Sequence, residues 1–281
     1  MTRARALVGI VTFNPEIALL SACIDHASSQ SPAVVVFDNA SANITEVRSI
    51  CSSRGVGLIE SPANNGIANA LNSILQEALK RNLEFALLLD QDSLLLPGSL
   101  EALERTASDS RIALAASSVA DRNAGTVQTE TRPVAYAITS GSLVSTSAWR
   151  EIGGYDERLF IDFVDFDFCV RARADGYQIV RTGESVISHA IGAADRKRFG
   201  TIYNYSPFRL EHMAADMVYF ARKHRHTPPD HKPRRSSRFG VALVLARKAA
   251  LISLYETSKI RKVGALITGA IRGARMPRLY T

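Results

Sequence analysis

The sequence predicts an α/β fold in which helices cover both faces of a largely parallel sheet. Short apolar runs alternate with segments of helical periodicity through the first 107 residues. The runs are apolar throughout, which is typical of strands that are buried on both faces. Polar residues end or follow several runs, at Thr12, Asp38 and Asp90. Ligands of such sheets bind at the carboxyl ends of the strands, so the pattern also predicts where a site would lie.

The predicted elements follow one another in a regular order. We expect strands at 6–13, 33–38, 56–61 and 85–90, each followed by a helical segment: one through Ile24, then 44–52, 67–81 and 97–107. Further on we expect shorter strands from Ile112 to Ser147, a helix from Asp165 to Asp175, a strand ending at His189 and a helix from Pro207 to Lys223. The Pro- and Arg-rich stretch 226–238 predicts a linker between a domain at 1–225 and a basic helical tail at 239–281.

Composition indicates a globular protein with an uneven charge distribution. The chain has 281 residues, of which 46% are hydrophobic, so it can bury a full core. Residues 222–281 hold 15 Lys and Arg against two acids, whereas the rest of the chain holds 19 basic and 25 acidic residues. Cys23, Cys51 and Cys169 lack metal-ligand spacing, so we expect reduced thiols in the cytoplasm. The first apolar run has no small-residue cleavage site and is interpreted as a strand rather than a signal peptide.

Asp90 and Asp92 flank Gln91 in a D-x-D pattern. In an extended segment or a tight turn, both carboxylates can reach one hard divalent cation such as Mg²⁺ or Mn²⁺. Such an ion could stabilise the charge on a departing diphosphate. The alternative is a strand-ending turn with solvated acids, and the D-x-D pattern alone leaves both open.

Two further polar segments could contact a nucleotide. Asp38 and Asn39 end the second predicted strand and could hold a base or a ribose, or could form an Asx turn that caps the next helix. Asn65 and Gly66 precede the helix at 67–81, where the backbone could cradle an anion or simply provide an N-cap.

The segment FIDFVDFDFCVR places Asp162, Asp165 and Asp167 among large apolar residues. Buried carboxylates are costly unless something binds them. A carboxylate beside aromatic rings has a raised proton affinity, which suits a general base that takes a proton from a sugar hydroxyl. The alternative is that these acids pair with Arg171 or Arg173 of the following helix.

Other residues add weaker indications. His189 could be a third metal ligand or a structural residue at a strand end. Gly141 and Ser142 predict a tight turn where a sugar could approach the backbone, although ordinary loop glycines would look the same. No G-x-S-x-G, P-loop or Cys/His zinc spacing occurs, which argues against a serine hydrolase, a P-loop ATPase and a zinc protein.

The order of the motifs is more specific than any one of them. Between about residues 6 and 225 the chain contains VTFN, FDNAS, NNGIANALN, LLLDQDS, TSGSLVS, GGYDERLFIDFVDFDFCVRARADGY and SHAIG. This series resembles the inverting family 2 glycosyltransferases with a GT-A fold, a Rossmann-like mixed sheet. Within that family it is similar to bacterial rhamnosyltransferases, whose DQDS and FIDxVD signatures occur here.

The resemblance implies a role for each motif. Asp90, Asp92 and His189 would form the metal and diphosphate site, with Mg²⁺ or Mn²⁺ as cofactor. The donor nucleotide would be bound by Thr12, Asn14, Asp38, Asn39, Asn65, Gly66, Gln91 and Arg209. Asp165 would be the catalytic base, and Asp162, Asp167, Ser140 and Gly141 would lie on the acceptor side.

The reaction implied by the resemblance transfers L-rhamnose from dTDP-rhamnose to a cell-surface polysaccharide or a lipid-linked glycan. Related chains tend to carry S-P-x-R-x-Y-Y-x-x-R-N after the histidine. Here SPFRLEHMAAD has Glu211, His212, Ala215 and Asp216 where the aromatic pair and Arg-Asn would fall. The chain thus lacks a cation expected near the diphosphate, and that role would pass to Arg209 or to the basic residues at 196–198. Two alternatives remain open: a transferase that uses a UDP-sugar as donor, and an inactive protein that binds a glycan or a nucleotide.

The tail at 239–281 mixes apolar runs with Lys and Arg. No uncharged run approaches the ~20 residues that span a bilayer. We expect helices that lie on an anionic membrane surface, so that the enzyme would be peripheral on the inner face of the plasma membrane. The alternative is a helical cap on the catalytic domain with a solvated basic face. No nucleic-acid motif accompanies the charge, so a nucleic-acid partner is not expected.

Overall fold

The computed structural model describes residues 4–121, 130–189, 195–197, 200–202, 204–228, 232–233 and 236–277. The chain forms two compact units. The first, here called the sheet unit, comprises residues 1–157 and 168–191. The second, the helical unit, comprises residues 158–167 and 192–281.

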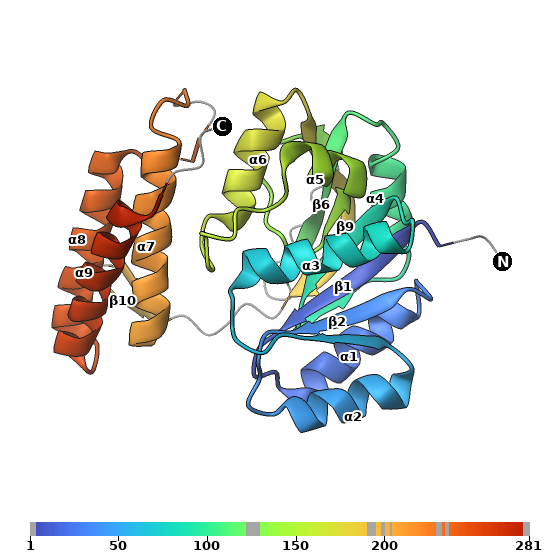
Figure 1. The fold of residues 1–281 in the computed structure, drawn as a ribbon, viewed down its shortest axis with the longest axis horizontal. Helices are drawn as coiled ribbons and strands as arrows, with labels where there is room; N and C mark the ends of the chain where they lie inside the picture. The colour runs from blue at the N-terminus through green and yellow to red at the C-terminus, as the bar shows by residue number, and fades with distance from the viewer. Residues whose placement is uncertain are drawn as a thin grey trace. The chain divides into compact units, whose positions relative to one another are not determined.

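The sheet unit contains most of the strands of the described chain (Figure 1). Its strands are β1 (Ala6–Thr12), β2 (Val34–Asp38), β3 (Gly57–Glu60), β4 (Phe85–Asp90), β5 (Ser93–Leu95), β6 (Ile112–Asp121), β7 (Arg132–Pro133), β8 (Ser142–Ser145) and β9 (Gln178–His189). Its helices are α1 (Ile17–Ser28), α2 (Ile44–Arg54), α3 (Ile67–Lys80), α4 (Ser99–Thr106) and α5 (Thr146–Ile152). Helix α6 (Val164–Ala174) begins in the helical unit and ends in the sheet unit.

The sheet has the order β3-β2-β1-β4-β8-β6-β9-β5, with β7 beside β9. The first four strands are parallel, whereas β8 is antiparallel to both of its neighbours. A parallel neighbour requires a crossover connection, which the helices between these first strands supply. The predicted α/β class with a mixed sheet is confirmed.

Helices cover both faces of the parallel strands, as Figure 1 shows for α3 on one side and α1 and α2 on the other. Residues of α1, α2 and α4 pack with every second residue of β1 and β4 in one apolar cluster. On the opposite face, Gly9 of β1 lies against Ile74 of α3. A Cβ at this position would overlap the Ile74 side chain, so the close approach of strand and helix requires glycine.

Helix α5 was not expected, because the sequence predicts short strands up to Ser147 and no helix directly after them. The local signals are nevertheless present. The Ser145 hydroxyl accepts the backbone N–H of Ala148 as an N-cap, and Gly153 ends the helix in the left-handed conformation with φ of 87°. A helix of seven residues is too short to show helical periodicity in the sequence.

The helical unit consists mainly of α7 (Pro207–Lys223), α8 (Arg238–Tyr255) and α9 (Lys259–Arg275), with a small hairpin of β10 (Asp195–Lys197) and β11 (Gly200–Ile202). Helix α7 has the bounds that the sequence predicts. It packs with the two following helices, because its apolar residues form one cluster with Val241, Ile252 and Leu266. The observed units therefore group α7 with the tail beyond the Pro- and Arg-rich stretch. No helix in the described part of the chain is long and apolar enough to cross a membrane.

Candidate active site

The ends of β1, β2 and β4 bring three predicted site residues to one edge of the sheet. Thr12 is the cross-strand partner of Asp38, and Val11 is the partner of Asp90. These strands run parallel, so their carboxyl ends, and the loops that follow, meet there. The structure thus assembles the three segments that the sequence singled out.

Asp38 is buried, with 1% of its surface exposed. Its Oδ2 accepts the backbone N–H of Ser41 at 2.8 Å and so closes a local turn, but Asp38 does not cap the next helix, whose N-cap residue is Asn43. Its Oδ1 is buried and has no hydrogen-bond partner among the described residues. A buried acceptor without a partner costs about 1–3 kcal/mol, so this oxygen is suited to accept a hydrogen bond from a ligand.

Asn39 connects the end of β2 to the loop before α3. Its Oδ1 accepts the backbone N–H of Asn65 at 3.0 Å, and its Nδ2 donates to the carbonyl of Gly66 at 3.2 Å. Gly66 has a φ of 86° and precedes a helix whose N-terminus has no side-chain cap. Both ends of the Asn39 amide therefore fix the loop, and the uncapped N–H groups of α3 are available to an anion.

Gln91 and Asn14 hold the neighbouring loops together. Gln91 Oε1 accepts from the Thr12 hydroxyl at 3.0 Å and from the backbone N–H of Phe13 at 2.9 Å. Asn14 adopts a φ of 48°, and its Oδ1 accepts the backbone N–H of Ala42 at 2.7 Å. These amides order the backbone around the strand ends.

The D-x-D turn is held from the segment before β8. Ser140 Oγ accepts the backbone N–H of Asp90 at 3.1 Å and shares a hydrogen bond of 2.7 Å with Ser93 Oγ. Gly141 donates its N–H to Leu88 at 2.8 Å with a φ of 74°, and a Cβ there would overlap the Ser117 side chain. Ser140 thus contacts the D-x-D turn and Gly141 contacts β4 just before it, although the resemblance assigns both residues to the acceptor side.

His189 lies in β9 opposite Ser93, the residue that follows Asp92. This pairing brings the backbone of His189 next to the D-x-D turn. Its side chain is outside the part of the chain that the structure describes. Within the described residues, no three His, Cys, Asp or Glu side chains gather into a group that could hold a metal ion.

Cys23 of α1 lies behind this turn and donates to the carbonyl of Asp90 at 3.6 Å. Burial, together with the negative charges of Asp92 and Asp90, raises the pKa of its thiol to about 12. The thiol is therefore neutral and unreactive, in agreement with the expectation of reduced cysteines; all three cysteines are free and buried.

The acidic segment at 158–167 belongs to the helical unit, where α7 supplies its partners. Asp162 forms an ion pair with Arg209 at 3.2 Å, whereas the sequence suggests Arg171 or Arg173 as partners of these acids. Burial raises the pKa of Asp162, and the charges of Arg209 and Lys248 partly offset this effect. Arg209, expected at the donor nucleotide, is thus placed beside the acidic segment.

Asp167 is fully buried and its Oδ1 lies 2.6 Å from Lys223 Nζ and 2.7 Å from His224 Nε2. Arg171 instead donates to two backbone carbonyls, of Ile152 and Gly154. A carboxylate that is enclosed in this way has a structural role, since no substrate can reach it.

Asp165 lies in the first turn of α6 and is half-buried. Its Oδ1 accepts the backbone N–H of Phe166 at 2.8 Å. Just before the helix, Phe163 adopts the left-handed conformation with φ of 65° and packs on Phe220 with ring centroids 4.8 Å apart. Such strain in a non-glycine residue persists only where the surroundings enforce it, and it is frequent at active sites.

Asp216 stands out in the sequence only as a departure from the family pattern. It is fully buried, and its carboxylate accepts the backbone N–H groups of Phe160, Ile161 and Asp162 at 2.9–3.1 Å. Burial raises its pKa to about 6 even though the three N–H groups favour the charged form. Asp216 therefore fixes the acidic segment to α7 through three hydrogen bonds.

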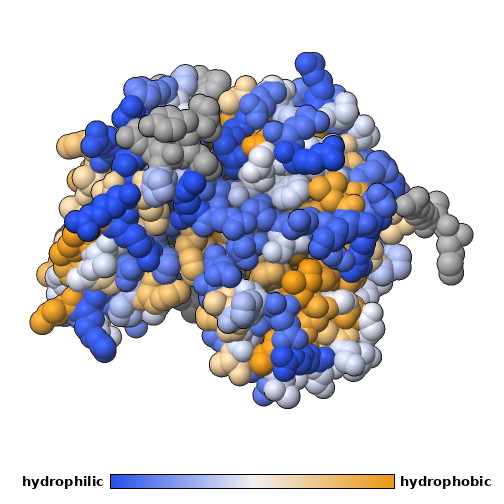
Figure 2. Space-filling view, in the orientation of Figure 1, coloured by the Kyte–Doolittle hydropathy of each residue, from blue (hydrophilic) through white to orange (hydrophobic). Residues whose placement is uncertain are grey.

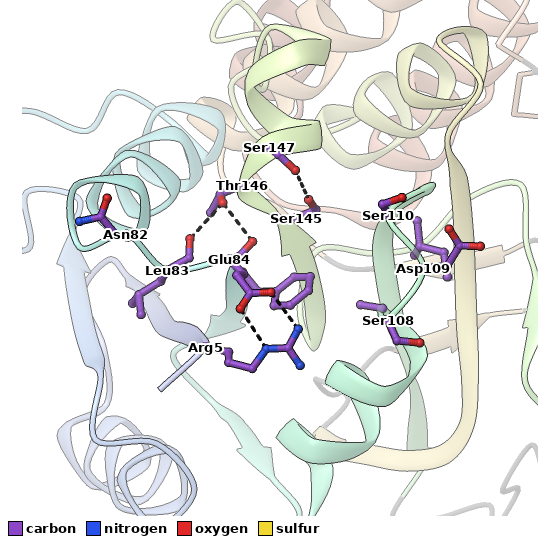
Figure 3. A pocket seen from close by; sticks show the side chains of 13 residues that line it. Arg5, Asn82, Leu83, Glu84, Ser108, Asp109, Ser110, Ser145, Thr146 and Ser147 are labelled. Atoms are coloured by element: carbon purple, nitrogen blue, oxygen red, sulfur yellow. Dashed lines mark hydrogen bonds and ion pairs between the residues drawn. The ribbon is translucent and has the colours of Figure 1, made fainter. Parts of the chain in front are cut away.

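A separate cavity of about 380 Å³ lies at the other edge of the sheet (Figure 3). Its lining includes Arg5, Glu84 and Ser145, which lie where β1 and β4 begin and the antiparallel β8 ends. Figure 3 shows Arg5 bound to Glu84 through two hydrogen bonds, of 2.8 and 3.1 Å. None of the predicted site residues lines this cavity.

Comparisons with known proteins identify the family of the chain. Residues 7–174 match the model of the family described as "Glycosyl transferase family 2". The chain is 29% identical over 239 residues to a protein of Shigella flexneri named dTDP-rhamnosyl transferase RfbF, which covers 78% of this chain and 80% of the relative.

Two solved structures share the fold. TarS (1–349) of S. aureus superposes with a TM-score of 0.61 at 14% identity, over 95% of this chain and 81% of that one. GalNAc-T7, solved with UDP, GalNAc and Mn²⁺, gives a TM-score of 0.61 at 12% identity, over 80% of this chain and 49% of that one. These structures establish the GT-A fold. Since the family model covers more than half of the sequence, the chain belongs to glycosyl transferase family 2 and is a glycosyltransferase.

Proposed function

We propose that the protein is a metal-dependent, inverting rhamnosyltransferase, which transfers L-rhamnose from dTDP-rhamnose to a lipid-linked or cell-surface glycan. The observation that carries the proposal is the similarity of most of the chain to a dTDP-rhamnosyl transferase. The DQDS and FIDFVD motifs, which prompted the same inference from the sequence, support it. The free thiols of all three cysteines support a reaction in the cytoplasm.

In this proposal the nucleoside of the donor binds at the ends of β1 and β2. The buried Oδ1 of Asp38 can accept a hydrogen bond from the base or the ribose. Thr12 and Gln91 order the adjoining backbone through their hydrogen bond. The uncapped start of α3 at Gly66 would favour a negatively charged group of the donor.

The donor atoms of the D-x-D turn fit a hard divalent cation. Asp90 and Asp92 offer carboxylate oxygens, and His189 lies on the neighbouring strand. Bound Mg²⁺ or Mn²⁺ would neutralise charge on the diphosphate leaving group. Ser140 fixes the backbone of Asp90, so the turn is ordered by the protein itself.

Asp165 is the proposed base. It takes the proton of the acceptor hydroxyl while that oxygen bonds to the anomeric carbon and the bond from this carbon to the diphosphate oxygen breaks on the opposite face. The configuration at the anomeric carbon inverts. One carboxylate suffices, because the diphosphate is already a good leaving group and needs no general acid.

Calorimetric titration with dTDP-rhamnose and with a panel of UDP-sugars, each with Mn²⁺ and with EDTA, tests the proposal. We expect metal-dependent binding that is selective for dTDP-rhamnose. Tighter binding of a UDP-sugar would favour the alternative in which the donor is a UDP-sugar rather than dTDP-rhamnose. Binding of nucleotide without turnover on any glycan acceptor would favour the inactive binding protein.

A further inference from the structure

Helices α8 and α9 each expose large apolar residues along one side of the helix. On α8 these are Phe239, Leu243 and Leu254, and on α9 Ile260, Ile267 and Ile271. Within each helix they are spaced at intervals that recur on one helical face. Phe239 is 80% exposed and Ile260 is 91% exposed. Figure 2 shows hydrophobic and hydrophilic residues intermingled over these helices, at the left of the view.

This exposed face is distinct from the face that packs inside the helical unit. Val241 and Ile252 of α8, and Leu266 of α9, are buried in a cluster with apolar residues of α7. Gly269 and Gly273 of α9 lie directly against the backbone of α7. Each helix therefore has an apolar face in contact with protein and a second apolar face in contact with water, which is unusual for a surface helix of a soluble domain.

The charge on the two helices has a single sign. Neither α8 nor α9 contains an acidic residue. Exposed basic residues accompany the apolar ones, namely Arg238, Arg247, Lys259, Arg261 and Arg275. Glu256, which lies between the helices, is mostly buried and paired with Lys262 at 2.7 Å. The exposed face thus combines apolar side chains with positive charge.

We propose that the α8–α9 face binds an anionic lipid surface, with the apolar residues inserted between the headgroups and the basic residues beside them. A second copy of the chain fits less well, because a two-fold contact through this face would oppose arginines to arginines. Nucleic acid would satisfy the charge but leave the isoleucines and Phe239 in water. From the sequence, a membrane-binding tail and a helical cap are alternatives. In the structure one face of these helices packs on α7 and the other is exposed, so the two roles are compatible.

Flotation of the purified full-length chain with vesicles tests this proposal without any nucleotide sugar, so its result does not depend on the proposed reaction. We expect binding to phosphatidylcholine vesicles that contain phosphatidylglycerol, little binding to pure phosphatidylcholine, and weaker binding as salt increases. The triple variant Phe239→Ser, Leu243→Ser, Ile260→Ser should bind at least about tenfold more weakly, since insertion scales with buried apolar area. The variant Arg247→Gln, Arg261→Gln should also bind more weakly.

The matched control is Ile138→Ser, which removes a 52% exposed isoleucine from the sheet unit and should bind like the parent chain. Thermal unfolding of each variant verifies that it is folded. Equal binding of the triple variant and the parent chain would overturn the proposal, as would equal binding to neutral and anionic vesicles. Light scattering that shows a dimer of the parent chain and a monomer of the triple variant would assign the face to a second copy instead.

Discussion

Asp216 of α7 accepts the backbone N–H of Asp162 at 2.9 Å, through the same oxygen that accepts the N–H of Ile161. Its other oxygen accepts the N–H of Phe160. One buried carboxylate thereby fixes three consecutive residues that precede the proposed base, Asp165. An isolated loop could not hold this backbone in one conformation, because the entropy of a mobile segment opposes it.

Asp216→Ala should reduce turnover while leaving donor binding unchanged. Without the carboxylate, three backbone N–H groups lose their acceptor and the segment before Asp165 loosens. Small displacements of a reacting group cost up to about a hundredfold in rate. We expect kcat to fall by about ten- to a hundredfold, with an unchanged donor Kd by calorimetry. A kcat equal to that of the parent chain would show that α7 does not position the segment.

The elevated pKa of Asp216 predicts a specific dependence of stability on pH. Its pKa is about 6 in the folded chain and lies near 3.8 when the group is exposed. Between these values the folded state binds more protons than the unfolded state, so this group favours folding below about pH 4 and loses that contribution as the pH rises through 6. A difference of about two pKa units corresponds to about 3 kcal/mol.

Urea unfolding at several pH values measures this dependence. Relative to the parent chain, Asp216→Asn should lack the component of stability that decreases from about pH 4 to pH 6, since an amide does not titrate. Identical pH profiles for the two chains would mean that Asp216 titrates at its ordinary pKa in the fold.

Asp38→Asn should weaken donor binding. The amide oxygen can still accept the N–H of Ser41, so the turn is retained, but the atom at the position of Oδ1 becomes a donor. A hydroxyl or N–H group of the ligand that would donate to Oδ1 of Asp38 then has no acceptor. This loss costs about 1–3 kcal/mol, which weakens the donor Kd roughly five- to a hundredfold. The control is Asp25→Asn on α1, which removes an exposed ion pair with Arg54 of α2. This variant should leave the donor Kd unchanged.

Gly269→Ala should destabilise the helical unit. A Cβ at this position would overlap the backbone carbonyl of Glu211, which cannot move away as a side chain would. Overpacking of this kind costs about 1–3 kcal/mol. Gly264→Ala on the same helix meets no atom within 4 Å and should stabilise the protein slightly, because alanine is the better helix former. Denaturant midpoints compare the two, and equal midpoints would contradict the close contact of α7 with α9.

Local patterns predicted the parallel strands and α7 well, because uninterrupted apolar runs and proline at a helix start are signals within a few residues. They also placed Thr12, Asp38 and Asp90 at one edge, since parallel strands end together. They could not identify Lys223 and His224 as the partners of Asp167, because that contact joins residues more than 50 positions apart. Asp216 was visible only as a departure from a pattern, since its role depends on where α7 packs.

Asp165 and Asp167 both lie in the first turn of α6, but we assign a catalytic role to Asp165 and a structural role to Asp167. Asp165→Asn removes the proposed base from a half-buried position, so transfer should fall by about 10²–10⁴-fold while donor binding and thermal stability are retained. Asp167→Asn instead removes a buried carboxylate from contact with Lys223 and His224. Breaking such a pair costs about 3–5 kcal/mol, so this variant should unfold at a lower temperature. Scanning calorimetry and an assay of released dTDP on both variants test the assignment. Full activity of Asp165→Asn would transfer the role of base to another group, and unchanged stability of Asp167→Asn would remove the structural role from its ion pair.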